Sequence, residues 1–530
     1  MKNKFKKVTC LMLSGMLISG ALAACNSGGT SVYDNPNTDD SQLILVQMYE
    51  GGYGTDWMEE IAKDFCEIYK EDGYVVKISK SASYMGNAFD SGLKAGPKIN
   101  TIDLYFGGSV NIDYMVEQGS KYYSGADCIF EDLTELYNSP VYGEETLYKD
   151  KLLKQCVDRN EFNGKYYATN WGGGPLGFIY NINFFKENGW KIPNTTNELI
   201  SLIAEIKADN YTPFVWCGTT ATYWSYIYMP WWYQLAGEEE VARFWECKDE
   251  DGNYTAEVFN SQARLQTFEL LEEMVYDVAN SHKKSITNTH IEAQMLLYDE
   301  THKIAMMPTG DWAENEMEIN GYPRNESSIG YMRVPVASDA IYQYDNYGNK
   351  NFRYQTIQSD EKLSEVIEAV DAGKTMLDGV SEEDFAAVKK LRSYTATQAF
   401  AHNAFIPSYS NAKVGAKKFL AYLASDAALQ KYYDLTGCLL PYDNKNVQLK
   451  ANATEFQKQI SATMQNVTLI SDRDSREKIW YKTGLNFTRG IAEAVIGTSA
   501  STEKMTGREY FNYCYKYVED NFNTFVGLIK

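Results

Sequence analysis

A single stretch, residues 164–189, most constrains how this chain can fold: GKYYATNWGGGPLGFIYNINFFKENG. Two runs of β-favouring residues, 165–169 and 176–180, flank Trp171, three consecutive glycines and Pro175. The glycines permit backbone conformations that are closed to other residues and put no side chains over the neighbouring surface. A flat ligand can therefore approach the backbone here, beside the indole. The same pattern also fits a glycine-rich hairpin corner around a core tryptophan.

The N-terminus carries a targeting signal. Four lysines precede an apolar run, residues 8–24, that is too short to span a membrane and ends in small residues. Leu-Ala-Ala-Cys at positions 22–25 resembles the lipobox of bacterial lipoproteins, which implies removal of residues 1–24 and lipidation of Cys25. Residues 25–41 are polar and form a flexible tether. We therefore expect a protein anchored by lipid to the extracytoplasmic face of the cell membrane.

The charge and size of the mature chain narrow its class. Without the four signal lysines it holds 46 basic and 71 acidic residues, a net charge of −25, which argues against nucleic acid as a partner. The 489 residues after the tether are too many for one core and predict at least two lobes. Aromatic residues make up 14% of the chain, and tyrosine and tryptophan suit amphiphilic ligands such as sugars.

Cysteines and histidines give no sign of a metal or cofactor site. The cysteines after Cys25 are odd in number and have no C-x-x-C spacing, so most should be buried and unpaired. The four histidines are scattered. Residues 249–253, Asp-Glu-Asp-Gly-Asn, lack the later glutamate of a calcium loop and predict a polar turn. We expect no metal and no cofactor.

Strands and helices alternate along the first part of the chain. Strands are expected at residues 43–48, 75–78 and 102–106, and a helix with a capping box formed by Asp56 and Glu59 should follow the first of them. This alternation predicts an α/β sheet, in which ligands lie beyond the carboxyl ends of the strands.

Helices and strands are also expected after the central stretch. Asn181 or Asn183 should cap a short helix that ends at Gly189, and Thr195 with Glu198 gives a second capping box. Further strands are predicted at residues 211–216 and 303–307, and helices around 363–370 and after 381. Residues 223–233, the most aromatic segment, predict a helix packed in a lobe core with one or two rings facing a cleft. Residues 338–358 are polar and loop-like.

Taken in order, these features resemble the extracellular solute-binding proteins of ABC transporters, in the carbohydrate-binding group related to maltose-binding protein. The resemblance rests on the lipobox, the strand and loop at 42–54, residues 164–198, the aromatic segment, residues 303–312 and residues 416–441. It implies a two-lobed α/β fold of the periplasmic-binding-protein type, with two or three crossover strands, a hinge and an interlobe cleft that closes around ligand. It also implies ABC permease subunits as partners, and we expect a monomer.

The resemblance divides the chain into segments. After the signal and tether, residues 42–170 and 395–445 are assigned to lobe 1, and residues 171–345 and 446–530 mainly to lobe 2. Residues 346–394 are longer and more polar than the family has there and are interpreted as a helical insertion near a crossover.

The expected ligand is a carbohydrate bound in the cleft. Trp312 is predicted to be an open stacking platform for a sugar ring, with Asp311 beside it accepting hydrogen bonds from hydroxyls. The alternative is that Trp312 starts a helix and fills the core of lobe 2. The full set of predicted ligand-binding residues is Tyr49, Glu50, Tyr53, Asn170, Trp171, Trp224, Trp231, Gly310, Asp311, Trp312 and Asn403.

Other functions fit the sequence less well. Glycoside hydrolysis needs two carboxylates that flank a sugar bond, and no pair stands out here. The G-x-S-x-G, Walker and H-E-x-x-H motifs are absent, so an enzyme is not expected. A peptide is the alternative ligand, although peptide capture needs charges for the termini. An adhesion lipoprotein would not need the whole ordered set of features.

Overall fold

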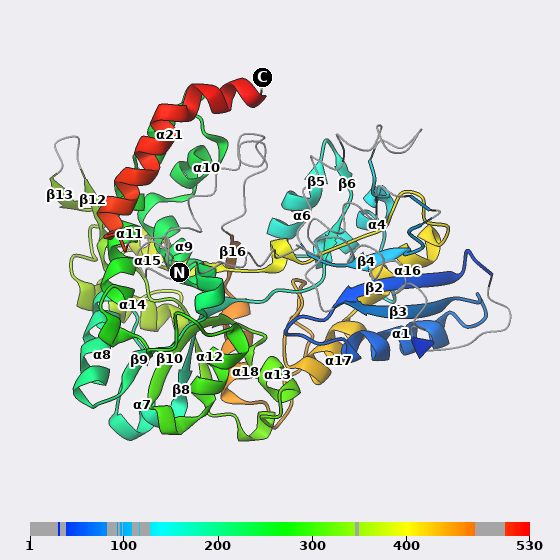
Figure 1. The fold of residues 1–530 in the computed structure, drawn as a ribbon, viewed down its shortest axis with the longest axis horizontal. Helices are drawn as coiled ribbons and strands as arrows, with labels where there is room; N and C mark the ends of the chain where they lie inside the picture. Colours follow the sequence, from blue (N-terminus) through cyan, green and yellow to red (C-terminus); the bar gives the residue numbers. More distant parts are fainter. Residues whose placement is uncertain are drawn as a thin grey trace, which may run out of the picture.

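The computed structural model describes residues 30–31, 39–81, 93, 96–97, 99–108, 116, 128–344, 349–471 and 504–529. Residues 1–29, with the predicted signal and Cys25, lie outside this range. No helix in the described residues is both long and apolar enough to cross a membrane. The chain builds two lobes that lie side by side, each around its own sheet (Figure 1).

The first lobe contains a six-stranded sheet. The predicted strands near 43–48, 75–78 and 102–106 are confirmed, and the first of them pairs in parallel with each of the other two. In order across the sheet the strands are β1 (Thr30–Ser31), β3 (Val75–Ser81), β2 (Leu43–Tyr49), β4 (Leu104–Phe106), β15 (Asn403–Phe405) and β7 (Thr169–Asn170).

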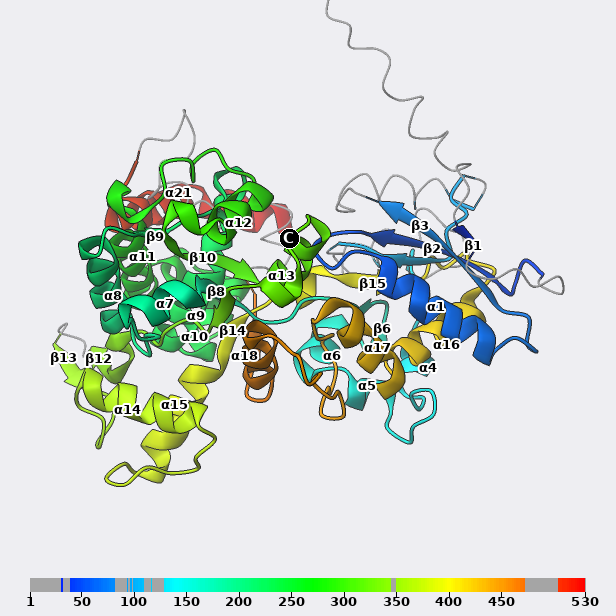
Figure 2. The same ribbon diagram turned by 90° about the horizontal axis from the view of Figure 1, so that it is seen from below.

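Helices complete the first lobe. The three on one face of the sheet are α1 (Asp56–Ile68), α16 (Lys413–Leu423) and α17 (Asp426–Thr436) (Figure 2). Phe65 of α1 and Phe419 of α16 meet there edge to face, 5.1 Å apart. Smaller elements of the same lobe are α4 (Thr134–Tyr137), α5 (Tyr148–Lys151), α6 (Lys154–Asn160) and the hairpin of β5 (Glu161–Phe162) and β6 (Lys165–Tyr166).

The second lobe contains a four-stranded sheet whose two central strands are buried along their whole length. Its order is β11 (Ile329–Met332), β8 (Leu176–Asn181), β10 (Ile304–Gly310) and β9 (Thr212–Phe214). The helices around it are α7 (Ile182–Asn188), α8 (Thr196–Ala208), α9 (Ser225–Ala236), α10 (Glu238–Glu246), α11 (Gln262–Val275), α12 (His290–Tyr298), α13 (Ala313–Ile319), α18 (Glu455–Met464) and α21 (Gly507–Ile529).

The central stretch passes from one lobe to the other. β7 belongs to the first sheet and β8 to the second, so residues 171–175 connect the lobes and do not turn a hairpin. Beside them runs a second connection, in which Thr397 Oγ1 donates to the Gly174 carbonyl at 3.1 Å. Gly173 has φ +100°, and a Cβ there would lie 2.2 Å from the Ala399 nitrogen. The neighbouring segment of the second connection therefore requires glycine at position 173. Because this segment already lies against the backbone, the prediction that a ligand approaches here is wrong for Gly173.

A second and a third connection also link the two lobes. β14 (Tyr394–Ala396) pairs in parallel with β16 (Thr468–Ile470) and leads into β15 of the first lobe. After α17 ends at Gly437 in a left-handed conformation, the chain goes back to the second lobe and forms α18. The described residues thus contain three connections between the lobes.

Local signals were confirmed in part. Asn181 caps α7 by accepting from Phe184 N at 3.0 Å, and Gly189 ends that helix at φ 74°. The predicted capping box of α1 is wrong, because Thr55 is its N-cap without a side-chain bond and Glu59 pairs with Lys80 instead.

Two other local predictions need correction. In the second predicted capping box only half forms, because Glu198 accepts from Asn194 N and not from Thr195 N. The loop expected at 338–358 contains an antiparallel pair, β12 (Tyr342–Tyr344) and β13 (Lys350–Phe352). The helices expected after it are confirmed as α14 (Asp360–Asp371) and α15 (Glu382–Ser393).

The cysteines behave as predicted. All those that the structure describes are buried: Cys66, Cys128, Cys156, Cys217, Cys247, Cys438 and Cys514. Burial raises the pKa of the Cys156 thiol, so this residue acts as a small hydrophobic side chain.

Candidate ligand-binding site

Rings from the second lobe and from the connections between the lobes surround Tyr53 of the first lobe. Its ring centroid lies 6.3 Å from Trp171, 6.3 Å from Trp312 and 5.9 Å from His402. The rings are close to perpendicular, an arrangement that aromatic pairs favour. Tyr53 follows β2, Trp171 follows β7 and Trp312 follows β10, so the ends of three strands converge here. We call Tyr53, Trp171, Trp312 and His402 the interlobe cluster.

Two tyrosines of the second lobe extend the cluster. Tyr223 and Tyr226 lie 6.2 Å and 6.3 Å from Trp312, at the start of the aromatic helix. Gln398, in the second connection, donates to the Tyr226 hydroxyl at 2.5 Å. Sequence reasoning selected the tryptophans of this segment and missed these tyrosines, because the direction each ring faces depends on how the helix docks.

The tryptophans selected in that segment lie in the core of the second lobe. Trp231 is fully buried and donates from Nε1 to the Pro335 carbonyl at 2.9 Å. Trp224 is also fully buried and packs on Phe178 and Phe214. The expectation that most rings of the segment pack in a core is confirmed. In this conformation both tryptophans are buried too deeply to contact a ligand.

Trp171 and Asn170 hold the first connection in position. Trp171 is fully buried, stacks on Trp57 and donates from Nε1 to the Gly107 carbonyl at 3.1 Å. Asn170 donates to the Ala399 carbonyl at 2.7 Å and accepts from Asn160 at 2.7 Å. Their polar groups are thus used within the protein, which fits a positioning role.

The remaining predicted residues lie at the ends of strands. Tyr49 and Glu50 are half-buried where β2 ends in the first lobe. Asn403 is buried in β15, opposite Asn170 in the sheet. Gly310 ends β10, and a Cβ there would lie 2.2 Å from the Trp312 ring, so this glycine makes room for the indole.

Trp312 is buried between the lobes. It is 7% exposed and forms the N-cap position of α13, so the prediction of an open platform is wrong for this conformation. The alternative was right that it starts a helix. Its ring, however, fills the space against Gly52 and Tyr53 of the first lobe as well as the tyrosines of the second.

Asp311 joins the two lobes through a hydrogen bond. The Tyr53 hydroxyl donates to its Oδ1 at 2.9 Å, and the carboxyl is 1% exposed. Burial raises the pKa of Asp311 from 3.8 to about 7, although the hydrogen bond from Tyr53 acts to lower it. The carboxyl therefore takes up a proton close to neutral pH, far above the range of an exposed aspartate.

This raised pKa predicts a pH-dependent stability. As the pH falls from 7.5 to 5.5, folded Asp311 binds a proton while the unfolded residue stays ionised. Proton binding to the folded state therefore raises the free energy of unfolding at acid pH, and this gain is lost as the pH rises through 7. We expect wild type to gain about 2 kcal/mol of unfolding free energy over Asp311→Asn across that range. Denaturant unfolding at both pH values measures it. Asp56→Asn, with a side chain that is 95% exposed, is the control. Identical pH slopes for wild type and Asp311→Asn would contradict the prediction.

No family model matches the chain. It is 25% identical over 215 residues to a protein named multiple sugar-binding protein from Streptococcus mutans, covering 41% of this chain and 44% of that protein. It is also 25% identical over 325 residues to the diacetylchitobiose binding protein NgcE of Streptomyces coelicolor, covering 57% and 64%. The chain thus matches less than two thirds of the length of either relative.

Solved structures give the wider match. A chitin oligosaccharide binding protein superposes with a TM-score of 0.60 at 16% identity, covering 92% of this chain and all of the other. The GacH receptor of Streptomyces glaucescens gives 0.58 at 14%, covering 93% and 100%. RafE in complex with raffinose gives 0.55 at 15%, covering 90% and 99%. The chain has a solute-binding-protein fold. The predicted two-lobed α/β fold and the resemblance to carbohydrate solute-binding proteins are confirmed.

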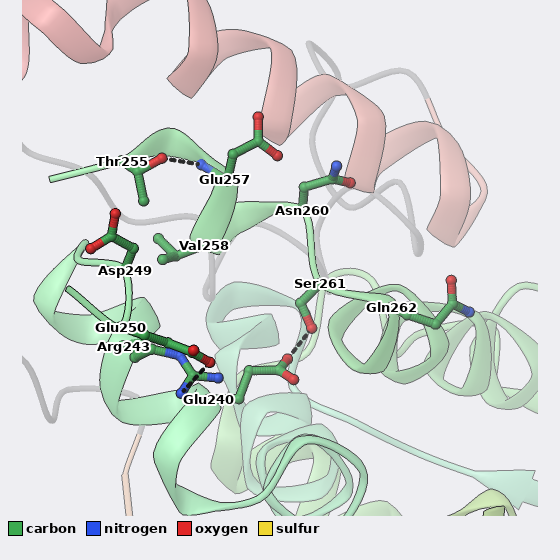
Figure 3. A pocket seen from close by; sticks show the side chains of 10 residues that line it. All are labelled: Glu240, Arg243, Asp249, Glu250, Thr255, Glu257, Val258, Asn260, Ser261 and Gln262. Atoms are coloured by element: carbon green, nitrogen blue, oxygen red, sulfur yellow. Dashed lines mark hydrogen bonds and ion pairs between the residues drawn. The ribbon is translucent and has the colours of Figure 1, made fainter. Parts of the chain in front are cut away.

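A pocket within one lobe is a separate feature from the interlobe cluster. One such pocket, of about 380 Å³, lies in the second lobe between α10 and the start of α11 (Figure 3). Arg243 pairs with Glu250 across it at 3.6 Å, and Asp249 is held in the predicted polar turn by accepting from Asn253 N at 2.8 Å. Among the described residues no group of three or more His, Cys, Asp or Glu side chains could hold a metal ion.

Proposed function

We propose that this protein captures a carbohydrate, an oligosaccharide, between its lobes and delivers it to the permease subunits of an ABC importer. The observation that carries the proposal is the interlobe cluster, in which rings from both lobes and a connection converge. Aromatic faces complement the apolar faces of sugar rings, and tyrosine hydroxyls serve their polar edges. The names of the relatives, which refer to several sugars, diacetylchitobiose and chitin oligosaccharide, support a carbohydrate over a peptide.

We propose that the ligand makes its first contacts at the half-buried edge of the cluster. Tyr49 and Glu50 would contribute from the first lobe, and Tyr223 from the second. Burial raises the pKa of Tyr223, with smaller contributions from Tyr226, Glu316 and then Tyr49. Its phenol therefore stays neutral and can both donate and accept hydrogen bonds to a sugar.

Binding without hydrolysis is the more consistent chemistry. Glycosidases need two carboxyl groups free to face one sugar bond. Asp311 accepts from Tyr53, and Glu314 accepts from Thr454 and from Gln457, each at 3.0 Å. The third carboxyl of this segment, Glu316, accepts from Gln294 at 2.5 Å. Each of the three has one oxygen engaged by a protein side chain, while Asp311 Oδ2 and Glu314 Oε1 are buried without a hydrogen-bond partner. Carboxylates held in this way support a binding protein.

A thermal-shift screen tests the proposed function. Oligosaccharides of the chitin, raffinose and maltose types are added to the full chain, with a dipeptide series as the alternative ligand. A ligand present at 100 times its Kd stabilises the folded state by about 2.7 kcal/mol, which raises the melting temperature. Stabilisation by one sugar class, without released product in a parallel glycosidase assay, is expected. Stabilisation by peptides alone, or sugar cleavage, would contradict the proposal.

We also propose that the protein acts as a monomer anchored through Cys25 outside the cytoplasm, on the strength of the four-position lipobox. Cys25→Ser should move the protein from the membrane fraction to the soluble extracytoplasmic fraction, because the lipobox of the variant lacks the thiol that would carry lipid. Cell fractionation and immunoblotting measure the shift, with Cys128→Ser as the matched control. If Cys25→Ser stays in the membrane fraction like wild type, there is no lipid anchor at this residue.

A further inference from the structure

Two loops from opposite lobes touch directly next to the interlobe cluster. The first-lobe loop holds Gly52 and Tyr53 after β2, and the second-lobe loop holds Asp311 and Trp312 after β10. Besides the 2.9 Å bond from Tyr53 to Asp311, Asn315 Nδ2 donates to the Gly52 carbonyl at 2.9 Å. These two loops are therefore joined by two hydrogen bonds that need no ligand.

Close packing joins the same two loops. A Cβ at Gly52 would lie 2.7 Å from Trp312 Cδ1 and 2.9 Å from its Cβ. These atoms are at the base of the indole, so no rotation of a flexible side chain relieves the overlap. Gly52 is not among the residues with positive φ, hence its own backbone does not require glycine. Among the described residues, the missing side chain at Gly52 lets Trp312 of the second lobe approach.

Arg324 supports the second-lobe side of this contact. It donates from Nη2 to Asn315 Oδ1 at 2.9 Å, which orients the amide towards Gly52. The same nitrogen lies 3.4 Å from the Leu435 carbonyl of α17, in the first lobe, and Arg324 pairs with Glu318 of α13. The contact is thus held by a second layer of polar interactions.

We propose that Gly52, Tyr53, Asp311, Trp312 and Asn315 form an interlobe latch that holds the lobes together in the absence of ligand. The latch regulates the proposed ligand site and in that sense rests on the proposed function, but its existence does not depend on any particular ligand. A protein that already populates the closed arrangement loses less of its binding energy to closure, since apparent affinity scales with the competent fraction.

The variants should open the lobes to different degrees. Tyr53→Phe removes one buried hydrogen bond and leaves Asp311 unsatisfied, which should lower the closed-to-open ratio roughly tenfold. Gly52→Ala forces the second lobe away and should abolish the closed population. Gly527→Ala is the matched control, because a Cβ at Gly527 meets nothing within 4 Å and the residue lies in α21, away from the contact.

The test measures the distance between the lobes in ligand-free full chain. Spin labels at Val414→Cys in α16 and Val278→Cys in the second lobe suit double electron–electron resonance, because these positions are 64% and 78% exposed. The buried native thiols should stay unlabelled. We expect a short distance in wild type and Gly527→Ala, a mixture in Tyr53→Phe and a long distance in Gly52→Ala.

Each outcome decides the proposal separately from the ligand. A long distance in ligand-free wild type, or a short one in both Gly52→Ala and Tyr53→Phe, overturns the latch. Circular dichroism checks that the variants fold, and Tyr53→Phe keeps the test valid if Gly52→Ala does not. Because no sugar is added, a failed sugar screen leaves this result unaffected, and a failed latch leaves sugar binding to be judged by titration.

Discussion

Replacing Trp171 by alanine should lower the free energy of unfolding by roughly 3–5 kcal/mol. The side chain is fully buried, stacks on Trp57 at 6.3 Å and contacts Phe106, Tyr53 and His402. Truncation removes the contacts of the indole ring and creates a cavity at the point where the first connection departs from the first lobe. It also removes the donor to the Gly107 carbonyl. Denaturant unfolding followed by circular dichroism measures the loss.

Control variants separate the effect of the cavity left by Trp171→Ala from the effect of the lost hydrogen bond. Trp171→Phe keeps most of the ring and should recover more than half of the lost stability. Tyr513→Ala, at a position in α21 that is 55% exposed, should change stability by less than about 0.5 kcal/mol. A loss below about 1 kcal/mol for Trp171→Ala would mean that this tryptophan does not organise the junction of the lobes.

Trp312→Ala should weaken carbohydrate binding about tenfold to hundredfold. The ring lies at the centre of the interlobe contact, against Tyr53 on one side and Tyr223 and Tyr226 on the other. Trp312 is buried in the present arrangement, so a ligand reaches its ring only when the lobes part; losing that aromatic contact surface then costs on the order of 1–3 kcal/mol, using the scale for bases on aromatic side chains. Calorimetric titration with the sugar found in the screen measures the change in Kd.

The stability of Trp312→Ala provides the contrast with Trp171→Ala. Because Trp312 packs between the lobes, its truncation should leave the core of each lobe intact and cost less stability than truncation of Trp171. Trp312→Phe should bind sugar more tightly than Trp312→Ala. Unchanged affinity in Trp312→Ala would remove this residue from the ligand site.

Hydrophobic periodicity was sufficient to predict most of the fold. The strands near 43–48, 176–180 and 303–307 were found because buried β-branched and aromatic runs are bounded by turn residues. The sequence showed that the glycines at 172–174 were unusual, but the contacts that require glycine there are tertiary. Gly173 faces the Ala399 backbone and Gly174 faces the Asp311 carboxylate, and both neighbours are more than 130 positions away in sequence.

The site was predicted less well, for a physical reason. Tyr53 and Asp311 were both selected, yet their contact spans 258 positions and depends on how two lobes dock, which no local pattern encodes. Trp224 and Trp231 were selected for their residue type, whereas Tyr223 and Tyr226 meet Trp312 because of where the aromatic helix begins. Helical periodicity predicts a buried face but does not predict which end of it borders the other lobe.

A crystal structure of the complex with the sugar selected by the screen is the most direct test of whether the ligand binds between the lobes. We expect a sugar ring in contact with both lobes at the interlobe cluster, within hydrogen-bonding distance of Tyr49 or Glu50 on one side and Tyr223 on the other. A sugar bound by one lobe alone, such as in the pocket beside Arg243 and Glu250, would contradict it.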